Sequence, residues 1–145
     1  MNAELAIFHQ LLNQTLQSWL TLLEPLSEEA LDAHPIADGN SLRVLAAHTL
    51  GATRFLVIDI AMGTPNPQRD RYAEFHATAN THSKAVLLEE LAALARDAAN
   101  LDPSRLEAEQ AAPNGRLFNV RWALWHGLEH ARQHLGQAQL LVKLI

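Results

Sequence analysis

Cysteine is absent from the 145-residue sequence, and aromatic side chains make up only 6% of it. A chain without cysteine can form neither a disulfide framework nor a metal site with thiolate ligands. Any thiol chemistry would therefore need a thiol that is supplied by a small molecule. The absence of cysteine fits a reducing compartment, and we expect a cytoplasmic protein.

Positive charge is also scarce. Lys and Arg number 11 against 16 Asp and Glu, which gives a formal net charge of −5. The basic residues form no cluster, and we expect no nucleic-acid partner, because phosphate binding needs a basic patch. No window of about 20 residues is both apolar and free of charge, so we expect no membrane span. The first residues, Met1–Glu4, lack the basic region of a signal peptide.

Alanine and leucine, both strong helix formers, dominate the 48% of residues that are hydrophobic. The length is about that of one domain, and we expect a single all-α domain over residues 1–145. Apolar side chains recur at three- and four-residue spacing in four segments, which is typical of amphipathic helices. The expected helices are Ala3–Glu24, Asn40–Met62, Ser83–Leu101 and Asn119–Leu144, with a short helical turn after Ser27.

Four helices of this length can bury their apolar stripes in one four-helix bundle. The stripe of the first helix consists of Leu5, Phe8, Leu12, Leu16, Trp19 and Leu23. The link between the second and third helices, residues 63–82, can cross the full length of the bundle at about 3.3 Å per residue. This long crossover predicts that the second and third helices run parallel. A loop of this length could instead serve as a lid.

Eight histidines stand out against 11 Lys and Arg. His126, His130 and His134 recur every four residues in the fourth helix, so they share one helical face. A buried imidazole needs partners for both ring nitrogens, and two histidines at this spacing can bind one metal ion. Ala131 follows His130, where the zinc-protease helix carries glutamate, which weighs against a peptidase.

A third metal ligand would have to come from another helix, and His48 is the best candidate. It lies midway along the second helix on an apolar face. The alternative remains open that these are hydrogen-bonded core histidines. His9 could face the same site, whereas His34, His76 and His82 are expected in loops or at a helix start. We interpret Arg43 and Arg54 as surface charges.

Three segments resemble the DinB-like superfamily of metal-binding bundles, which includes the YfiT-type proteins. His130–Gln137 is similar to the family's H-x-x-x-H-x-G-Q signature. Ser41–His48 is similar to the segment with the family's first histidine, and Leu26–Pro35 to the segment before it. The resemblance implies a four-helix bundle with a long crossover between helices two and three. It also implies a site for zinc, nickel or a similar ion whose ligands are His48, His130 and His134, with His126 outside this set.

The resemblance further implies a metal-dependent transferase or isomerase that uses a low-molecular-weight thiol such as bacillithiol, mycothiol or glutathione. Two alternatives remain: a hydrolase that uses metal-bound water, and a non-catalytic metal-binding or interaction bundle. A small-molecule substrate and a homodimer are the expected partners. Phe118, Trp122 and Trp125 are predicted to project away from the histidine face, where they would form a dimer surface or cover the preceding loop.

Overall fold

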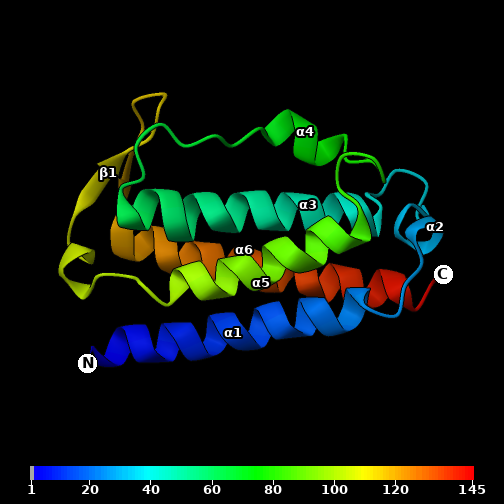
Figure 1. Ribbon diagram of the computed structural model, residues 1–145, viewed down its shortest axis with the longest axis horizontal. Coiled ribbons are helices and arrows are strands. Elements are labelled where there is room, and N and C mark those ends of the chain that lie inside the picture. Colours follow the sequence, from blue (N-terminus) through cyan, green and yellow to red (C-terminus); the bar gives the residue numbers. More distant parts are fainter. Residues whose placement is uncertain (1) are drawn as a thin grey trace.

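The computed structural model describes residues 2–145 (Figure 1). Four long helices lie side by side, as predicted for an all-α four-helix bundle: α1 (Ala3–Leu23), α3 (Leu42–Thr53), α5 (Lys84–Ala98) and α6 (Val120–Val142). In Figure 1, α3 and α5 run in the same direction, opposite to α1 and α6. The segment between α3 and α5 returns along the outside of the bundle, so the predicted long crossover is confirmed.

Side-chain caps explain where the helices begin. Each cap side chain accepts a hydrogen bond from the backbone N–H three residues later, which satisfies one of the free donors at a helix start. Ser41 caps α3 in this way, and Ser27 caps the short helix α2 (Glu28–Leu31). The other long helices are capped by Asn2, Ser83 and Asn119.

The core is built from the predicted apolar stripes. The six stripe residues of α1 are all at most 5% exposed, and Leu87, Leu91 and Leu94 of α5 are at most 1% exposed. Burying each of these large apolar side chains contributes roughly 1.5–3 kcal/mol. Trp19 also donates a hydrogen bond from Nε1 to the Ala131 carbonyl at 3.2 Å, which ties α1 to the middle of α6.

The second predicted helix is not regular throughout. After Thr53 the backbone adopts π-helical hydrogen bonding over η1 (Arg54–Ile60), before a last turn ends at Gly63. The wider turn lies against α6 at Gly127, where an added Cβ would come within 2.9 Å of Val57 Cγ2. Glycine at this position therefore lets α6 approach η1. π-Turns of this kind often occur beside functional sites.

The sequence did not predict three small features. The crossover contains a short helix, α4 (Arg71–Phe75), and the irregular segment after α5 contains a 3₁₀ turn (Pro103–Arg105). A hairpin then follows, in which β1 (Glu109–Ala111) pairs antiparallel with β2 (Leu117–Asn119). Gly115 in its turn has a φ of 86°, which favours glycine. None of the helices in residues 2–145 combines the length and apolar character needed to cross a membrane.

Arg43 is not a surface charge, so that prediction was wrong. Its side chain is fully buried between α2 and the start of α5. Its guanidinium donates to Asp32 Oδ1 at 2.7 Å and to the carbonyls of His82 and Glu28 at 2.7 and 2.9 Å. Because it satisfies carbonyls of two separate segments, Arg43 holds α2 and the end of the crossover against α3. Arg54 is different, since 38% of its side chain is exposed and it pairs with Asp97.

We predict that Arg43→Met lowers the free energy of unfolding by about 2 kcal/mol, because it leaves buried carbonyls without donors. Arg54→Met is the matched control and should lower it by less than about 1 kcal/mol, as for an exposed ion pair. Urea unfolding followed by circular dichroism measures both values. Equal losses in the two variants would contradict the structural role of Arg43.

Candidate metal centre

His48, His130 and His134 come together where α3 packs against α6. His130 and His134 occupy adjacent turns on one face of α6, and His48 lies on the facing side of α3. In each of the three residues one ring nitrogen lies within 4.8 Å of those of the other two. The structure therefore joins the three predicted ligands in one group that could hold a metal ion.

The spacing of the ring nitrogens suits a transition-metal ion. His130 Nε2 lies 3.1 Å from His48 Nε2 and 3.1 Å from His134 Nε2. Two imidazole nitrogens bound to one tetrahedral zinc ion at its usual bond length are roughly 3.3 Å apart. The observed separations thus need only a small adjustment to admit an ion.

Acceptor oxygens beside His48 and His134 determine which ring nitrogen of each histidine carries the proton. His48 Nδ1 is 3.0 Å from Glu74 Oε1, and His134 Nδ1 is 2.7 Å from Gln137 Oε1. Both oxygens are acceptors, so both Nδ1 atoms must donate. In a neutral imidazole the other nitrogen then carries a lone pair. The Nε2 lone pairs of His48 and His134 therefore both face His130 Nε2.

His130 cannot satisfy both lone pairs. Its Nε2 carries one proton at most, so at least one of the two lone pairs is left without a donor. Burial, together with the charges of His134 and His48, lowers the pKa of His130 to about 4, which disfavours a charged ring at the centre of the group. Burial also lowers the pKa of His134. A bound cation would resolve the conflict.

Glu74 is the residue of the site that sequence reasoning missed. It lies on α4, is 5% exposed, and accepts hydrogen bonds from His48 and from both Nε and Nη2 of Arg69 at 3.0 Å. Burial alone would raise the pKa of Glu74, but the hydrogen bonds from His48 and Arg69 outweigh it and leave that pKa below the usual carboxyl value. A carboxylate behind a metal-binding histidine fixes the ring orientation and strengthens the ligand.

Gly51 makes room for Glu74 on the surface of α3. A Cβ at this position would collide with the Glu74 carboxylate, so α4 can approach only because residue 51 is glycine. A glycine one turn after His48 was the only signal in the sequence for this contact.

His130 differs from the other two histidines, since its buried Nδ1 has no hydrogen-bond partner within residues 2–145.

The other histidines lie outside the group. His126 is half exposed and its ring stacks on Trp122, with centroids 4.5 Å apart, and is 6.3 Å from the ring of His130. His9 stays on α1, and its buried Nε2 has no partner among the described residues. His34 and His76 make local contacts with backbone carbonyls, as expected for loop residues.

A cleft of about 370 Å³ opens beside the three grouped histidines and is lined by His48, His126 and His130. Phe118 and Trp122 form part of its wall, so the prediction that they project away from the histidine face was wrong. Phe118 lies on β2 of the hairpin, and Trp122 lies in the first turn of α6, four residues before His126 and thus beside the histidine face. Trp125 does point away, because it packs on Phe8 and donates to Glu4.

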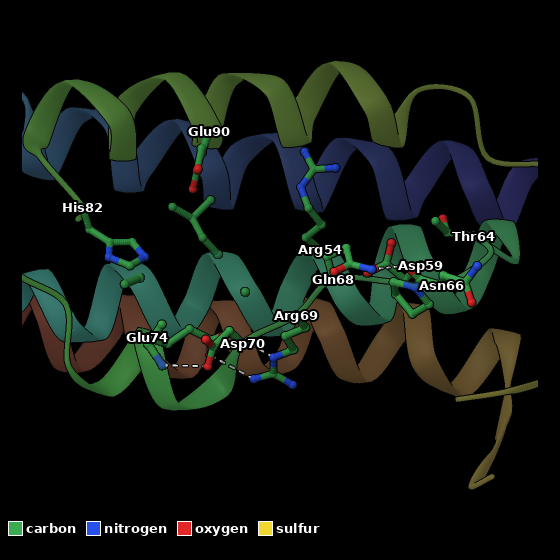
Figure 2. Close-up of a pocket in the computed structure, with 15 residues that line it drawn as sticks. Arg54, Asp59, Thr64, Asn66, Gln68, Arg69, Asp70, Glu74, His82 and Glu90 are labelled. Atoms are coloured by element: carbon green, nitrogen blue, oxygen red, sulfur yellow. Dashed lines mark hydrogen bonds and ion pairs between the residues drawn. The ribbon is translucent and has the colours of Figure 1, made fainter. Parts of the chain in front are cut away.

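A larger cavity of about 630 Å³ lies under the crossover, between α3 and α5 (Figure 2). Its wall carries both signs of charge, including Arg54, Asp59 and Glu90, and it contains none of the three grouped histidines. Arg69 borders both spaces. Because only the smaller cleft reaches His48 and His130, it is the space in which a bound metal ion would meet a ligand.

The fold and the site together define a helical bundle with a long crossover and three histidines that face one another. The chain belongs to the DinB superfamily, whose family model matches residues 11–138. A comparison with curated proteins finds no significant match.

In the metal-free protein, we predict that the free energy of unfolding falls as the pH is lowered from about 6.5 to about 4. In this window the unfolded chain protonates a histidine that the folded protein keeps neutral, because the folded pKa of His130 is about 4 against an ordinary 6.5. The slope should approach about 1 kcal/mol per pH unit, below the single-proton limit because the rings are partly solvated.

Urea unfolding in EDTA at several pH values measures this slope. His130→Gln should flatten it, whereas His76→Gln, a change at an exposed histidine, should leave it as in the wild type. The same slope in the wild type and in His130→Gln would show that burial of this ring is not linked to protonation.

Proposed function

We propose that this protein binds one divalent transition-metal ion through His48, His130 and His134, and that the ion acts on a small molecule bound in the adjacent cleft. The observation that carries the proposal is the set of lone pairs directed at one point. The protons of His48 and His134 are held on the outer nitrogens by Glu74 and Gln137. Two lone pairs then face a third imidazole within 3.1 Å.

The ligand set favours a transition-metal ion, and the family resemblance favours zinc or nickel among them. Imidazole nitrogen suits zinc, nickel, copper and iron(II), whereas magnesium and calcium prefer oxygen ligands. No carboxylate belongs to the group, since Glu74 contacts the outer nitrogen of His48. A metal ion bound by three neutral rings would therefore keep its full positive charge.

The resemblance to thiol-dependent relatives favours an S-transferase that takes a low-molecular-weight thiol as cosubstrate. The metal, when bound, would lower the pKa of the thiol and supply a thiolate. The sulfur would bond to an electrophilic carbon while the leaving group departs with its electron pair and the thiol proton passes to solvent. The residues of the chain would orient both partners, with His126 and Trp122 on the cleft wall.

We predict that the purified protein, dialysed and loaded with zinc or nickel, holds one equivalent of metal. His48→Ala and His134→Ala should weaken binding by more than about 100-fold, because each removes a ligand. Both variants should keep their helicity, since the apolar stripes remain. Metal analysis by mass spectrometry and circular dichroism measure the two properties.

Variants near the ligands provide the controls. Glu74→Gln should retain metal with an affinity lower by about 10- to 100-fold, as for other changes behind a metal ligand. His126→Ala should weaken binding less, and His76→Ala not at all. Retention of one tightly bound equivalent by both His48→Ala and His134→Ala would rule out this site.

For the reaction, we predict that the metal-loaded protein consumes a small thiol in the presence of an electrophile, and that His134→Ala lowers the rate by about 100-fold or more. Thiol disappearance across glutathione, bacillithiol and mycothiol, each with a panel of electrophiles, measures it. Metal binding without any consumption would favour the non-catalytic bundle, and cleavage of esters or amides without a thiol would favour the hydrolase. The homodimer and the cytoplasmic location stay predictions.

A further inference from the structure

Positively charged side chains are concentrated in the cleft beside the three grouped histidines. Its wall includes three arginines, Arg69, Arg71 and Arg116, and no aspartate or glutamate. The chain as a whole has a formal net charge of −5, so this local excess is the reverse of the overall balance. The arginines come from the crossover and from the β-hairpin, two segments that are far apart in the sequence.

Two of these arginines are not neutralised by the protein. Arg69 is occupied, because it makes a bidentate pair with Glu74. Arg71 and Arg116 are exposed, and neither forms an ion pair with a carboxylate within residues 2–145. Their side chains can therefore donate to a ligand without first breaking an internal pair.

Aromatic rings support both guanidinium groups. Arg71 Cζ lies 5.0 Å from the centre of the Phe75 ring, and Arg116 Cζ lies 4.5 Å from that of Phe118. A guanidinium held over a ring face keeps its N–H edge free, and that edge matches the oxygens of a carboxylate or phosphate. The stacking thus limits the motion of two long side chains while leaving their donors available.

The rest of the cleft wall is largely apolar and includes three aromatic side chains, Phe55, Phe118 and Trp122. Phe55 and Phe118 are in edge contact at 5.8 Å, and Trp122 stays 45% exposed although its ring stacks on His126. A large apolar side chain that lines a cleft and is left partly exposed suits a flat or apolar part of a ligand. Acid-binding and apolar surfaces therefore lie next to each other, within reach of the grouped histidines.

From this arrangement we propose that the cleft recognises a small dianion, a phosphate ester or a dicarboxylate with a flat or apolar body. Arg71 and Arg116 bind the acid groups, and Trp122 and Phe118 contact the body. The role of this dianion as the substrate or cosubstrate of the metal centre rests on the proposed function. Binding of the dianion itself needs no metal, because the arginines and aromatic rings belong to the chain.

The test is calorimetric titration of the EDTA-treated full-length protein at pH 8 with phenyl phosphate and with phthalate. Benzyl alcohol and benzylamine serve as neutral and cationic probes of similar shape. We expect a dianion to bind at least about tenfold more tightly than either control. The double variant Arg71→Gln/Arg116→Gln should lose about tenfold in affinity for the dianion. Arg96→Gln, which alters an exposed arginine paired with Glu89 on α5, should bind as the wild type does.

Circular dichroism and metal content show whether the double variant still folds and keeps the histidine site. Tighter binding of phenyl phosphate would assign a phosphate ester, and tighter binding of phthalate a dicarboxylate; either supports the proposal. Equal binding of dianion and benzyl alcohol, or an unchanged affinity in the double variant, would overturn it. Since these titrations contain no metal, failure of metal binding would overturn the proposed function and leave the result for the dianion intact.

Discussion

The buried carboxylate of Glu74, held between His48 and Arg69, is the interaction on which the arrangement of the site depends. It fixes the proton of His48 on Nδ1, so the lone pair of Nε2 points toward α6. The same hydrogen bond attaches the crossover to α3, because His48 belongs to α3, while two hydrogen bonds from Arg69 hold the carboxylate within the crossover. A buried carboxylate is stable only when it is paired in this way.

The crossover consequently does more than connect two parallel helices. Its short helix α4 supplies Glu74 behind the first histidine, and its arginines reach the cleft in front of the group. On the opposite side, the four-residue spacing on α6 places His130 and His134 on adjacent turns. The three grouped histidines therefore come from long helices, while charge and shape in the cleft come from the crossover and the hairpin.

The parts of this structure that follow local rules could be predicted from the sequence. The stripe of α1, the cap at Ser41 and the grouping of His48 with the α6 histidines each reflect periodicity, capping or a resemblance. Contacts set by tertiary packing could not be predicted. Arg43 has the sequence context of a solvated helix residue, and its burial depends on carbonyls contributed by α2 and the crossover.

Tertiary packing also determines parts of the site that could not be predicted from the sequence. Trp122 lies four residues before His126, so helical spacing places it beside the histidine face, and its contact with His126 could have been predicted. The hairpin that adds Phe118 to the same cleft wall could not. Glu74 lies in a segment without periodicity, and only the glycine at position 51 indicates that something approaches α3 there. The π-helical turn of η1 likewise leaves an ordinary amphipathic pattern in the sequence.

X-ray absorption spectroscopy of the zinc- or nickel-loaded protein is the most direct test of the metal centre, because it reports the atoms bound to the ion. The account predicts three imidazole nitrogens at about 2.0–2.1 Å for zinc, together with at least one exchangeable ligand such as the oxygen of a water molecule. It also predicts the loss of one imidazole contribution in any His134→Ala protein that still retains metal. A first shell made mainly of carboxylate oxygens, or one that His134→Ala leaves unchanged, would contradict it.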